Sequence, residues 1–563
     1  MTEPQQAAQN HDDHEPNYLS HRQIMQVLAG LMMGMFLSAL DQTIVATAIR
    51  TIGDDLNGLS LQAWVTTAYL ITATITTPLY GKLGDIYGRK RLFLWSIGIF
   101  VVGSVLCTFA NTMYQLAGFR AVQGIGAGGL FSLALAIIGD IVPPRERAKY
   151  QGAFLAVFGT ASVLGPLVGG FFAGTDSIVG ITGWRWVFLV NVPIGIVALL
   201  VVNSTLHVPH RRLDHAIDWW GALALVVGLV PLLTIAEQGR EWGWQSGKAF
   251  ACYGIGVVGL VAFVFIERAM KEEALLPLRF FSNRTFALTN IVGVIMGAAM
   301  FGGLAGLPLY LQIVKDNTPT RAGLLLIPLT LGIMSGSIMS GQVISRTGKY
   351  KVFPLVGAVT LIISLGLLST VKPETSLVAT GLLSALFGFG LGNLLQPTVL
   401  AVQNAVSPRD IGVATSSATF FRQMGGTLGT AVFLSVLFNQ WAARSGQEFA
   451  KAAADPNSAF SLATRDPQVL AQPQNKHFLE KLQQVQSPGG SASGAFNDTS
   501  FLHGVSKGLT QPLFNAFTYG MSHIFLIASG ATVVALALLF FLPNIPLRGR
   551  GAGDGQGAPA AGH

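Results

Sequence analysis

The sequence predicts an all-α membrane protein with fourteen transmembrane helices, arranged as two six-helix halves and two inserted central helices. Three observations carry this prediction. Of the 563 residues, 51% are apolar and only 11% are charged, whereas about a quarter of the residues of a soluble globular protein are charged. Apolar runs of about 20 residues, the length that crosses a bilayer, recur along the whole chain. Two loop sequences also occur twice at similar offsets.

The apolar runs give the positions of the predicted helices. They start near Ile24, Leu61, Leu92, Leu116, Tyr150, Arg185, Ile217, Ala249, Phe286, Ala322, Phe353, Leu377, Ile411 and Met521. With the N-terminus inside, the short inner loops collect most of the lysines and arginines, as the positive-inside rule requires. We therefore expect a multi-pass protein of a bacterial cytoplasmic membrane, with both termini in the cytoplasm.

The order of helices and loops predicts the domain boundaries. Polar tails are expected at 1–20 and 546–563, six-helix bundles at 21–206 and 271–545, and the inserted helix pair at 207–270. Residues 439–520 are rich in Gln, Ser, Ala, Pro and Gly, and the number of preceding helices places them outside the cell. This segment is expected to be a mostly flexible extracytoplasmic loop that can dock an external partner.

Internal repetition supports the division into two halves. The segment Gly81-Lys82-Leu83-Gly84-Asp85-Ile86-Tyr87-Gly88-Arg89-Lys90-Arg91 is echoed by Gly341-Gln342-Val343-Ile344-Ser345-Arg346-Thr347-Gly348-Lys349-Tyr350-Lys351, at an offset of 260 residues (341 − 81). The sequence around Pro144 recurs around Pro408, 264 residues later (408 − 144). Because Ser345 replaces Asp85, the two halves are not chemically equivalent.

Other features exclude several classes of protein. The net charge of +8 arises from basic residues in short loops rather than on one continuous face, which disfavours nucleic-acid binding. Cys107 and Cys252 both fall in predicted spans, so a disulfide framework is not expected. The sequence has no H-E-x-x-H, G-x-S-x-G or P-loop pattern, and we expect no enzyme activity, no metal and no cofactor.

Three charges inside the apolar runs are candidates for function. A charged side chain in hydrocarbon costs about 2.5 to 3.5 kcal/mol, so each one requires a partner or a role. Asp41 and Arg120 are both predicted to lie roughly 8 Å below the outer boundary of the membrane, which makes an ion pair possible. The alternative for Asp41 is a packing role, with its carboxylate bonded to a neighbouring hydroxyl. Arg422 is predicted near mid-depth, where it either lines a cavity or is paired.

Several motifs resemble those of one family. Gly81 to Arg91 is similar to the loop between the second and third helices of the major facilitator superfamily. Leu40-Asp41-Gln42-Thr43-Ile44-Val45-Ala46, Arg120-Ala121-Val122-Gln123-Gly124-Ile125-Gly126-Ala127-Gly128-Gly129, and Trp184-Arg185-Trp186-Val187-Phe188-Leu189-Val190-Asn191-Val192-Pro193-Ile194-Gly195 resemble motifs of its fourteen-helix drug:proton antiporters. Gly159, Gly165, Pro166, Gly169 and Gly170 match the antiporter motif of the fifth helix, for which a plain packing seam is the alternative.

The resemblance implies a major facilitator fold and the roles of particular residues. Asp41 and Arg120 would couple transport to protons, with the proton gradient as the energy source and sodium as an alternative ion. Gly81, Asp85, Gly88, Arg89 and Arg91 would form a conformational latch, in which Asp85 binds the start of the helix near Ile411. Candidate cavity residues are Trp64, Tyr69, Gln123, Tyr310, Gln312, Asn393, Gln396 and Arg422.

The function implied is proton-coupled export of lipophilic, often cationic, compounds from the cell. One alternative is a dedicated exporter of an endogenous lipid, siderophore or antibiotic that works by the same mechanism. Another, outside transport, is a membrane sensor or scaffold that has lost coupling. Retention of Asp41, Asp85 and Arg120 together argues against the sensor.

Overall fold

The computed structural model describes residues 21–56, 62–142, 144–206, 218–407, 410–486, 502, 504–545 and 547. The predicted tail at 1–20 lies outside the described residues, as does the tail at 546–563 apart from residue 547.

Long helices make up the N-terminal half. They are α1 (His21–Asp55), α2 (Gln62–Tyr87), α3 (Arg89–Thr108), α4 (Met113–Ile141), α5 (Pro144–Ala173), and a sixth helical segment formed by α6 (Trp186–Leu189) and α7 (Asn191–Thr205). A small hairpin, β1 (Ser177–Ile178) and β2 (Ile181–Thr182), lies between α5 and α6, with Ser177 paired to Thr182. Two further helices, α8 (Trp219–Trp242) and α9 (Gly247–Met270), follow this half.

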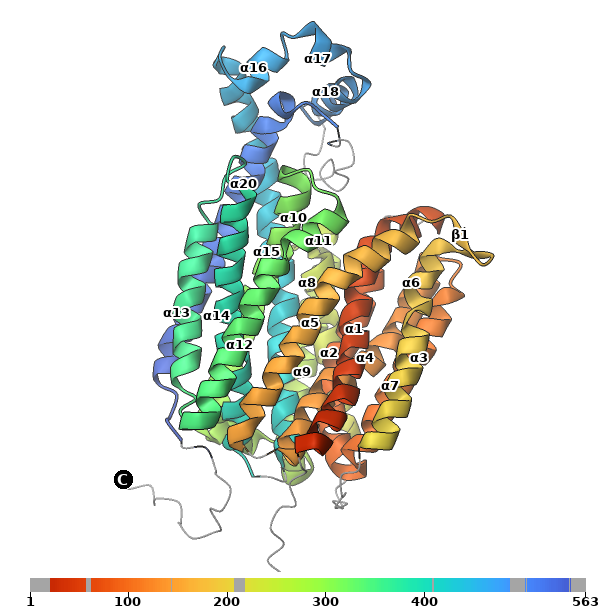
Figure 1. Ribbon diagram of the computed structural model, residues 1–563, viewed down its shortest axis with the longest axis vertical. Coiled ribbons are helices and arrows are strands. Elements are labelled where there is room, and N and C mark those ends of the chain that lie inside the picture. The colour runs from red at the N-terminus through yellow and green to blue at the C-terminus, as the bar shows by residue number, and fades with distance from the viewer. Residues whose placement is uncertain are drawn as a thin grey trace, which may run out of the picture.

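The C-terminal half contains six more long helical segments. They are α10 (Arg284–Leu309), α11 (Pro319–Leu325) with α12 (Ile327–Thr347), α13 (Val352–Leu368), α14 (Leu377–Asn404), α15 (Ile411–Ala454) and α20 (Lys507–Phe540). Three short helices connect α15 to α20: α16 (Ala459–Ala463), α17 (Pro467–Ala471) and α18 (Pro473–Gln486). They lie beyond one end of the C-terminal half (Figure 1), which we call the α16–α18 end. The opposite end, where α15 begins, is called the α2–α3 end, because Asp85 near the end of α2 contacts Val413 there.

The lengths and compositions of these helices suit a membrane. Ten helices of the described residues are long and apolar enough to cross a bilayer. The apolar part of α5 and all of α13 are shorter, and α2 and α15 are not among the ten. Each predicted span corresponds to a helix, and the fold is all-α as predicted; the number of fourteen membrane crossings stays a prediction.

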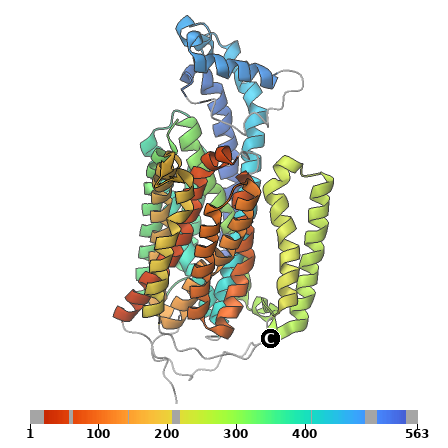
Figure 2. The ribbon, with the colours of Figure 1, turned by 90° about the vertical axis from the view of Figure 1, so that its right-hand side faces the viewer.

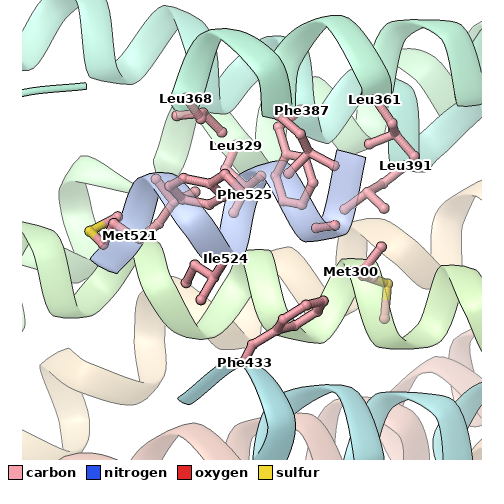
Figure 3. Packing of buried hydrophobic residues seen from close by; sticks show 14 of the residues in the cluster. Met300, Leu329, Leu361, Leu368, Phe387, Leu391, Phe433, Met521, Ile524 and Phe525 are labelled. Carbon is pink, nitrogen blue, oxygen red and sulfur yellow. The ribbon is translucent and has the colours of Figure 1, made fainter. Parts of the chain in front are cut away.

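Each half has its own apolar core. In the C-terminal half, side chains from α10, α12, α13, α14, α15 and α20 meet in one cluster. Figure 3 shows part of this cluster, with Phe433 and Met300 on one side of Ile524, and Phe525 and Phe387 on the other. The N-terminal half is packed in two clusters of its own.

Glycines bring α4 close to its neighbours on both sides. A Cβ at Gly124 would collide with the backbone of Tyr69 on α2, and one at Gly126 would collide with the backbone of Phe100 on α3. Small residues of this kind allow helix backbones to approach closely in a membrane, where packing replaces the hydrophobic effect as the main force between helices. The position of Arg120, on the same helix, is therefore fixed from two directions.

The hairpin of α8 and α9 stands beside the bundle (Figure 2). Leu225 and Leu229 of α8 pack in one cluster with Ile71 and Ile75 of α2 and with Phe420 of α15. The inserted pair therefore contacts both halves through α8, while α9 leaves much of its apolar surface exposed, as a lipid-facing helix does.

Three local predictions were wrong. The segment 81–91 is almost entirely helical, and only Gly88 interrupts the helix between α2 and α3. Helix α1 continues to Asp55, well beyond a span of about 20 residues from Ile24. Helix α20 starts at Lys507 rather than near Met521. The described part of 439–520 is largely helical rather than a flexible loop: α15 and α20 both extend beyond the bundle and carry α16 to α18 (Figure 2). Trp441, fully buried between these extensions, donates from Nε1 to the Leu513 carbonyl at 3.0 Å.

Candidate functional site

The side chain of Asp41 lies inside the N-terminal half, fully buried. Its Oδ2 forms an ion pair and hydrogen bond with Nη1 of Arg120. Its Oδ1 accepts hydrogen bonds from Gln123 Nε2 at 2.9 Å and from Asn191 Nδ2 at 2.7 Å. The predicted pairing of Asp41 with Arg120 is confirmed, and the carboxylate has three donors instead of the hydroxyl partner of the alternative.

Gln123 connects the ion pair to a second layer of polar groups. Its Oε1 accepts from Arg120 Nη1 at 2.7 Å, and its Nε2 donates to Ser104 Oγ at 2.7 Å. Arg120 and Gln123 are three residues apart on α4, so both point to the same face of that helix. We call Asp41, Ser104, Arg120, Gln123 and Asn191 the Asp41 network; each of them is at most 1% exposed.

Two members of the Asp41 network were missed in the sequence. Asn191 stands in the motif from Trp184 to Gly195. Its amide between apolar residues could have marked it as a buried hydrogen-bonding residue. Ser104 gave no signal, because a serine inside a helix usually bonds its own backbone. Ser104 does so too: its Oγ donates to the Phe100 carbonyl at 2.9 Å, while it accepts from Gln123.

Tyr69 covers the Asp41 network on one side. Its ring lies 4.1 Å from the guanidinium carbon of Arg120, and its hydroxyl lies 2.9 Å from the hydroxyl of Ser38. Such a cation–π contact is strong when both groups are desolvated. Tyr69 and Ser38 also line the central cavity, whereas Asp41 does not. Tyr69 therefore stands between the buried carboxylate and the cavity.

The central cavity has a volume of about 580 Å³ and lies between the two halves. This is within the size range of small-molecule pockets, about 300 to 1,000 Å³. Most of its surface is apolar, with Phe131, Phe158, Phe301, Leu304 and Leu395 among the lining residues. Polar lining residues come from α1 and α2 in one half and from α14 and α15 in the other: Ser38, Gln42, Thr66, Tyr69, Thr74, Gln396, Thr419, Arg422, Gln423, Thr427 and Thr430.

The structure brings only some of the predicted cavity residues to this cavity. Tyr69, Gln396 and Arg422 line it. Gln123 belongs to the Asp41 network instead.

The remaining four predicted cavity residues are used elsewhere. Trp64 packs against Trp242, with ring centroids 6.2 Å apart. Tyr310 donates to the Lys372 carbonyl at 2.9 Å, and Asn393 donates to the Phe389 carbonyl of its own helix at 2.9 Å. Gln312 lies in the π-helical turn Tyr310–Val314 and is not among the lining residues. The prediction that these four line the cavity was wrong, since sequence shows depth but not which way a helix faces.

Asp85 links the two halves at the α2–α3 end. Its Oδ2 accepts from the backbone N–H of Val413, at the start of α15, at 3.2 Å. The predicted contact with this helix end is confirmed, and it places a negative charge at the positive end of the helix dipole. Gly412 leaves room for the carboxylate, because a Cβ there would overlap Asp85. Across the same boundary, Gln403 Nε2 donates to the Leu135 carbonyl at 3.3 Å.

Of the other predicted latch residues, Arg89, Gly88 and Gly81 contribute to this end of the bundle, whereas Arg91 does not. Arg89 pairs with Asp85 at 2.9 Å and with Asp140 of α4 at 2.6 Å. Gly88 has a φ of 96°, which favours glycine, and Gly81 gives α15 the space in which Ser416 packs. Arg91 is exposed on α3 and makes none of these contacts.

The predicted antiporter motif forms a seam of small residues on α5. Gly165 and Gly169 pack against Thr43 and Ile44 of α1. On the side of the other half, Gly159 packs against Thr330, while Gly170 faces Thr320 and Pro166 faces Gly323. Helix α5 therefore joins α1, which carries Asp41, to α11 and α12 of the C-terminal half.

Comparisons with known proteins agree with this architecture. The family model described as Major Facilitator Superfamily matches residues 31–430, more than half of the chain. The multidrug transporter protein MdtP of Bacillus subtilis is 37% identical over 413 residues, which are 73% of this chain and 75% of that protein. Multidrug resistance protein 3 of the same organism is 36% identical over 447 residues, 79% of this chain and 86% of that protein.

A solved structure has the same fold at low sequence identity. The proton:xylose symporter XylE superposes with a TM-score of 0.56 at 14% identity, over 93% of this chain and 98% of that one. The chain therefore belongs to the major facilitator superfamily, as a multi-pass membrane transporter and not an enzyme.

Proposed function

We propose that this protein is a proton-coupled antiporter that exports lipophilic compounds across a bacterial cytoplasmic membrane. The observation that carries the proposal is the buried Asp41–Arg120 pair next to a cavity between the two halves. A buried ion pair is weak evidence for stability, because the cost of removing the charges from water offsets their attraction. A role in binding and releasing a proton is a better reason for its presence.

The donors around Asp41 define the chemistry of the site. Arg120, Gln123 and Asn191 together stabilise the ionised carboxylate. Protonation of Asp41 would remove its charge and leave the guanidinium of Arg120 without its counter-ion. Tyr69 contacts both that guanidinium and the cavity, so a compound in the cavity would act on the proton site through Tyr69.

The latch supplies the second part of the cycle. By the positive-inside rule the α2–α3 end is cytoplasmic, and there Asp85 and Gln403 hold the halves together. We therefore take this arrangement as a state closed to the cytoplasm. Loss of these contacts, with α5 and its glycine seam as the pivot, would open the cavity to the cytoplasm by alternating access.

The apolar lining favours lipophilic compounds, as in the sequence-based hypothesis. We do not extend the proposal to cations, because the described lining residues include no carboxylate. The proposal needs no cofactor, since the proton gradient is the energy source.

Transport in proteoliposomes tests the proposed function. A pH gradient should drive accumulation of fluorescent lipophilic compounds by the wild type, and a protonophore should abolish it. Asp41→Asn should bind the compounds without gradient-driven transport, while the surface control Asp455→Asn should behave as wild type. Gradient-driven transport by Asp41→Asn at the wild-type rate would contradict the proposal; no transport of any compound by folded wild-type protein would favour the dedicated exporter.

A further inference from the structure

The central cavity contains a single charged side chain among its described lining residues, and that charge is positive. It is the guanidinium of Arg422 on α15, in the C-terminal half. Tyr69 lines the same cavity from α2, in the N-terminal half. The described lining has no Asp or Glu that would attract a cation.

Arg422 has no counter-ion among the residues that the structure describes. Within the part of the chain that the structure describes, its side chain forms no ion pair or hydrogen bond, in contrast to Arg120 and Arg89, which have carboxylate partners. Arg422 also lies eleven residues into α15, so at 1.5 Å per residue its Cα is roughly 16 Å from the helix end. This depth is too great for the side chain to reach water at the membrane surface.

The position of Arg422 is fixed by close packing of its backbone. A Cβ at Gly297 of α10 would collide with the carbonyl of Arg422, and Gly293 lies one turn away on the same face. Because α10 occupies this side of α15, the helix cannot rotate to carry the side chain out of the cavity. The charge is held at the cavity wall by the fold of the C-terminal half.

A second polar side chain at the wall, Gln396, has one atom without a partner among the described residues. Gln396 on α14 is only 7% exposed, and its Oε1 has no hydrogen-bond partner in the described structure. Gln423, next to Arg422, accepts from Thr77 Oγ1 at 3.1 Å across the boundary between the halves. The guanidinium of Arg422, which only donates, is suited to a bound group with acceptor oxygens. The Gln396 Oε1, an acceptor, is suited instead to an N–H or O–H donor on the same compound.

We propose that Arg422 selects amphipathic organic anions, compounds with an apolar body and a carboxylate, sulfonate or phosphate group, as substrates of this cavity. The anionic group would bind Arg422, and the apolar body would lie on the Phe and Leu side chains toward Tyr69. An anion compensates the guanidinium charge where water is scarce, whereas a lipophilic cation would be repelled by it. This inference rests on the proposed function for the identity of the cavity as the transport site.

A matched pair of dyes tests the inference. Anilinonaphthalenesulfonate and phenylnaphthylamine share one ring system, and only the first carries a sulfonate. Dissociation constants would be measured by fluorescence with the full-length protein in nanodiscs of zwitterionic lipid, after subtraction of empty nanodiscs. The wild type should bind the sulfonate more tightly than the neutral dye by about tenfold, the equivalent of one charge-assisted hydrogen bond.

Variants of Arg422 identify the source of this preference. The ratio of the two constants should fall to about one in Arg422→Gln and should be largely restored in Arg422→Lys. Arg444→Gln, which removes an arginine of the same helix outside the cavity, should keep the wild-type ratio, and thermal melting should show that all variants are folded. Equal binding of both dyes by the wild type, or an unchanged ratio in Arg422→Gln, would overturn the inference.

The dye-binding measurements, together with transport of the same dyes in proteoliposomes by wild type and Asp41→Asn, separate this inference from the proposed function. If the sulfonate is preferred through Arg422 but pH-gradient-driven transport is independent of Asp41, the inference stands and the antiport proposal fails. If the dyes bind with equal strength and are transported through Asp41, only the inference fails. Absence of any binding by folded wild type would overturn both.

Discussion

Asp41 is held by donors from two different helices, Arg120 and Gln123 on α4 and Asn191 on α7. None of its bonds can be replaced by water, because the whole Asp41 network is buried. Loss of one charge therefore affects the other directly, and the two residues should act as one unit. This coupling gives a prediction about stability that is independent of transport.

Arg120→Met should lower the free energy of unfolding by about 3 to 5 kcal/mol, because it leaves the Asp41 carboxylate buried without its counter-ion. The double variant Asp41→Asn with Arg120→Met should be more stable than Arg120→Met alone, with a coupling energy of about 1 to 3 kcal/mol. Unfolding titrations with dodecyl sulfate in mixed micelles measure both. Strictly additive effects of the two substitutions would mean that the charges do not depend on each other.

The chemistry of the residues was only partly predictable from the sequence. Asp41 and Arg120 stood out because charges in apolar runs are rare and costly. Asn191 and Ser104 did not, since neutral polar residues are common in helices and their contacts with Gln123 and Asp41 join distant parts of the chain. The orientation of each cavity candidate depended on how the helices are rotated, which is fixed by packing and not by local sequence.

Helices in this protein are held in place by glycines at specific crossings. Helix α4 has two glycines that illustrate the difference between a packed and an open position. A Cβ at Gly124 would overlap Thr72 and the Tyr69 carbonyl of α2, whereas a Cβ at Gly118 would have none of the described atoms within 4 Å. Because Tyr69 covers the Asp41 network, the packing at Gly124 also affects the site.

Gly124→Ala should destabilise the protein by about 1 to 3 kcal/mol through overpacking against α2. Gly118→Ala on the same helix should be neutral or stabilising by up to about 1 kcal/mol, because alanine is the better helix former. Thermal melting in detergent compares the two variants. The explanation would fail if both substitutions had the same effect.

The latch at Asp85 holds two helices of different halves together. Asp85 connects the end of α2 to the start of α15 through the Val413 N–H. In Asp85→Asn, the loss of the charge at the N-terminus of α15 removes about 1 kcal/mol of attraction between the halves. The fraction of molecules in which this interface is open should therefore rise by about fivefold.

Labelling with a membrane-impermeant maleimide measures that access. The probe is a cysteine introduced by Ala414→Cys, because Ala414 is fully buried at the interface. The background carries Cys252→Ser, and labelling of the remaining native Cys107 is subtracted with a sample that lacks Ala414→Cys. Asp85→Asn should speed the reaction from the cytoplasmic side. Asp410→Asn is the matched control, because Asp410 pairs with Arg279 within the same half; a rise of equal size in this control would argue against a specific latch.

At the scale of the whole molecule, two cores with a cavity between them form the basis of the proposed cycle. Hydrophobic runs and the repeated loops were enough to predict the helices and the two halves. They did not predict that α15 and α20 extend beyond the bundle, because the polar face of an extended helix resembles a loop in composition. The contacts that join the halves, at Asp85, Gln423 and the α5 seam, connect residues far apart in the chain.

The most direct test of the account is proton release from the purified protein when a compound binds. Anilinonaphthalenesulfonate, phenylnaphthylamine and tetraphenylphosphonium would be added to the protein in weakly buffered detergent solution with a pH-sensitive dye, while binding is measured in parallel. Compounds that bind the wild type should release protons, and Asp41→Asn should bind the same compounds without proton release. Equal proton release by Asp41→Asn, or binding to the wild type with no release across the pH range, would contradict Asp41 as the coupling site.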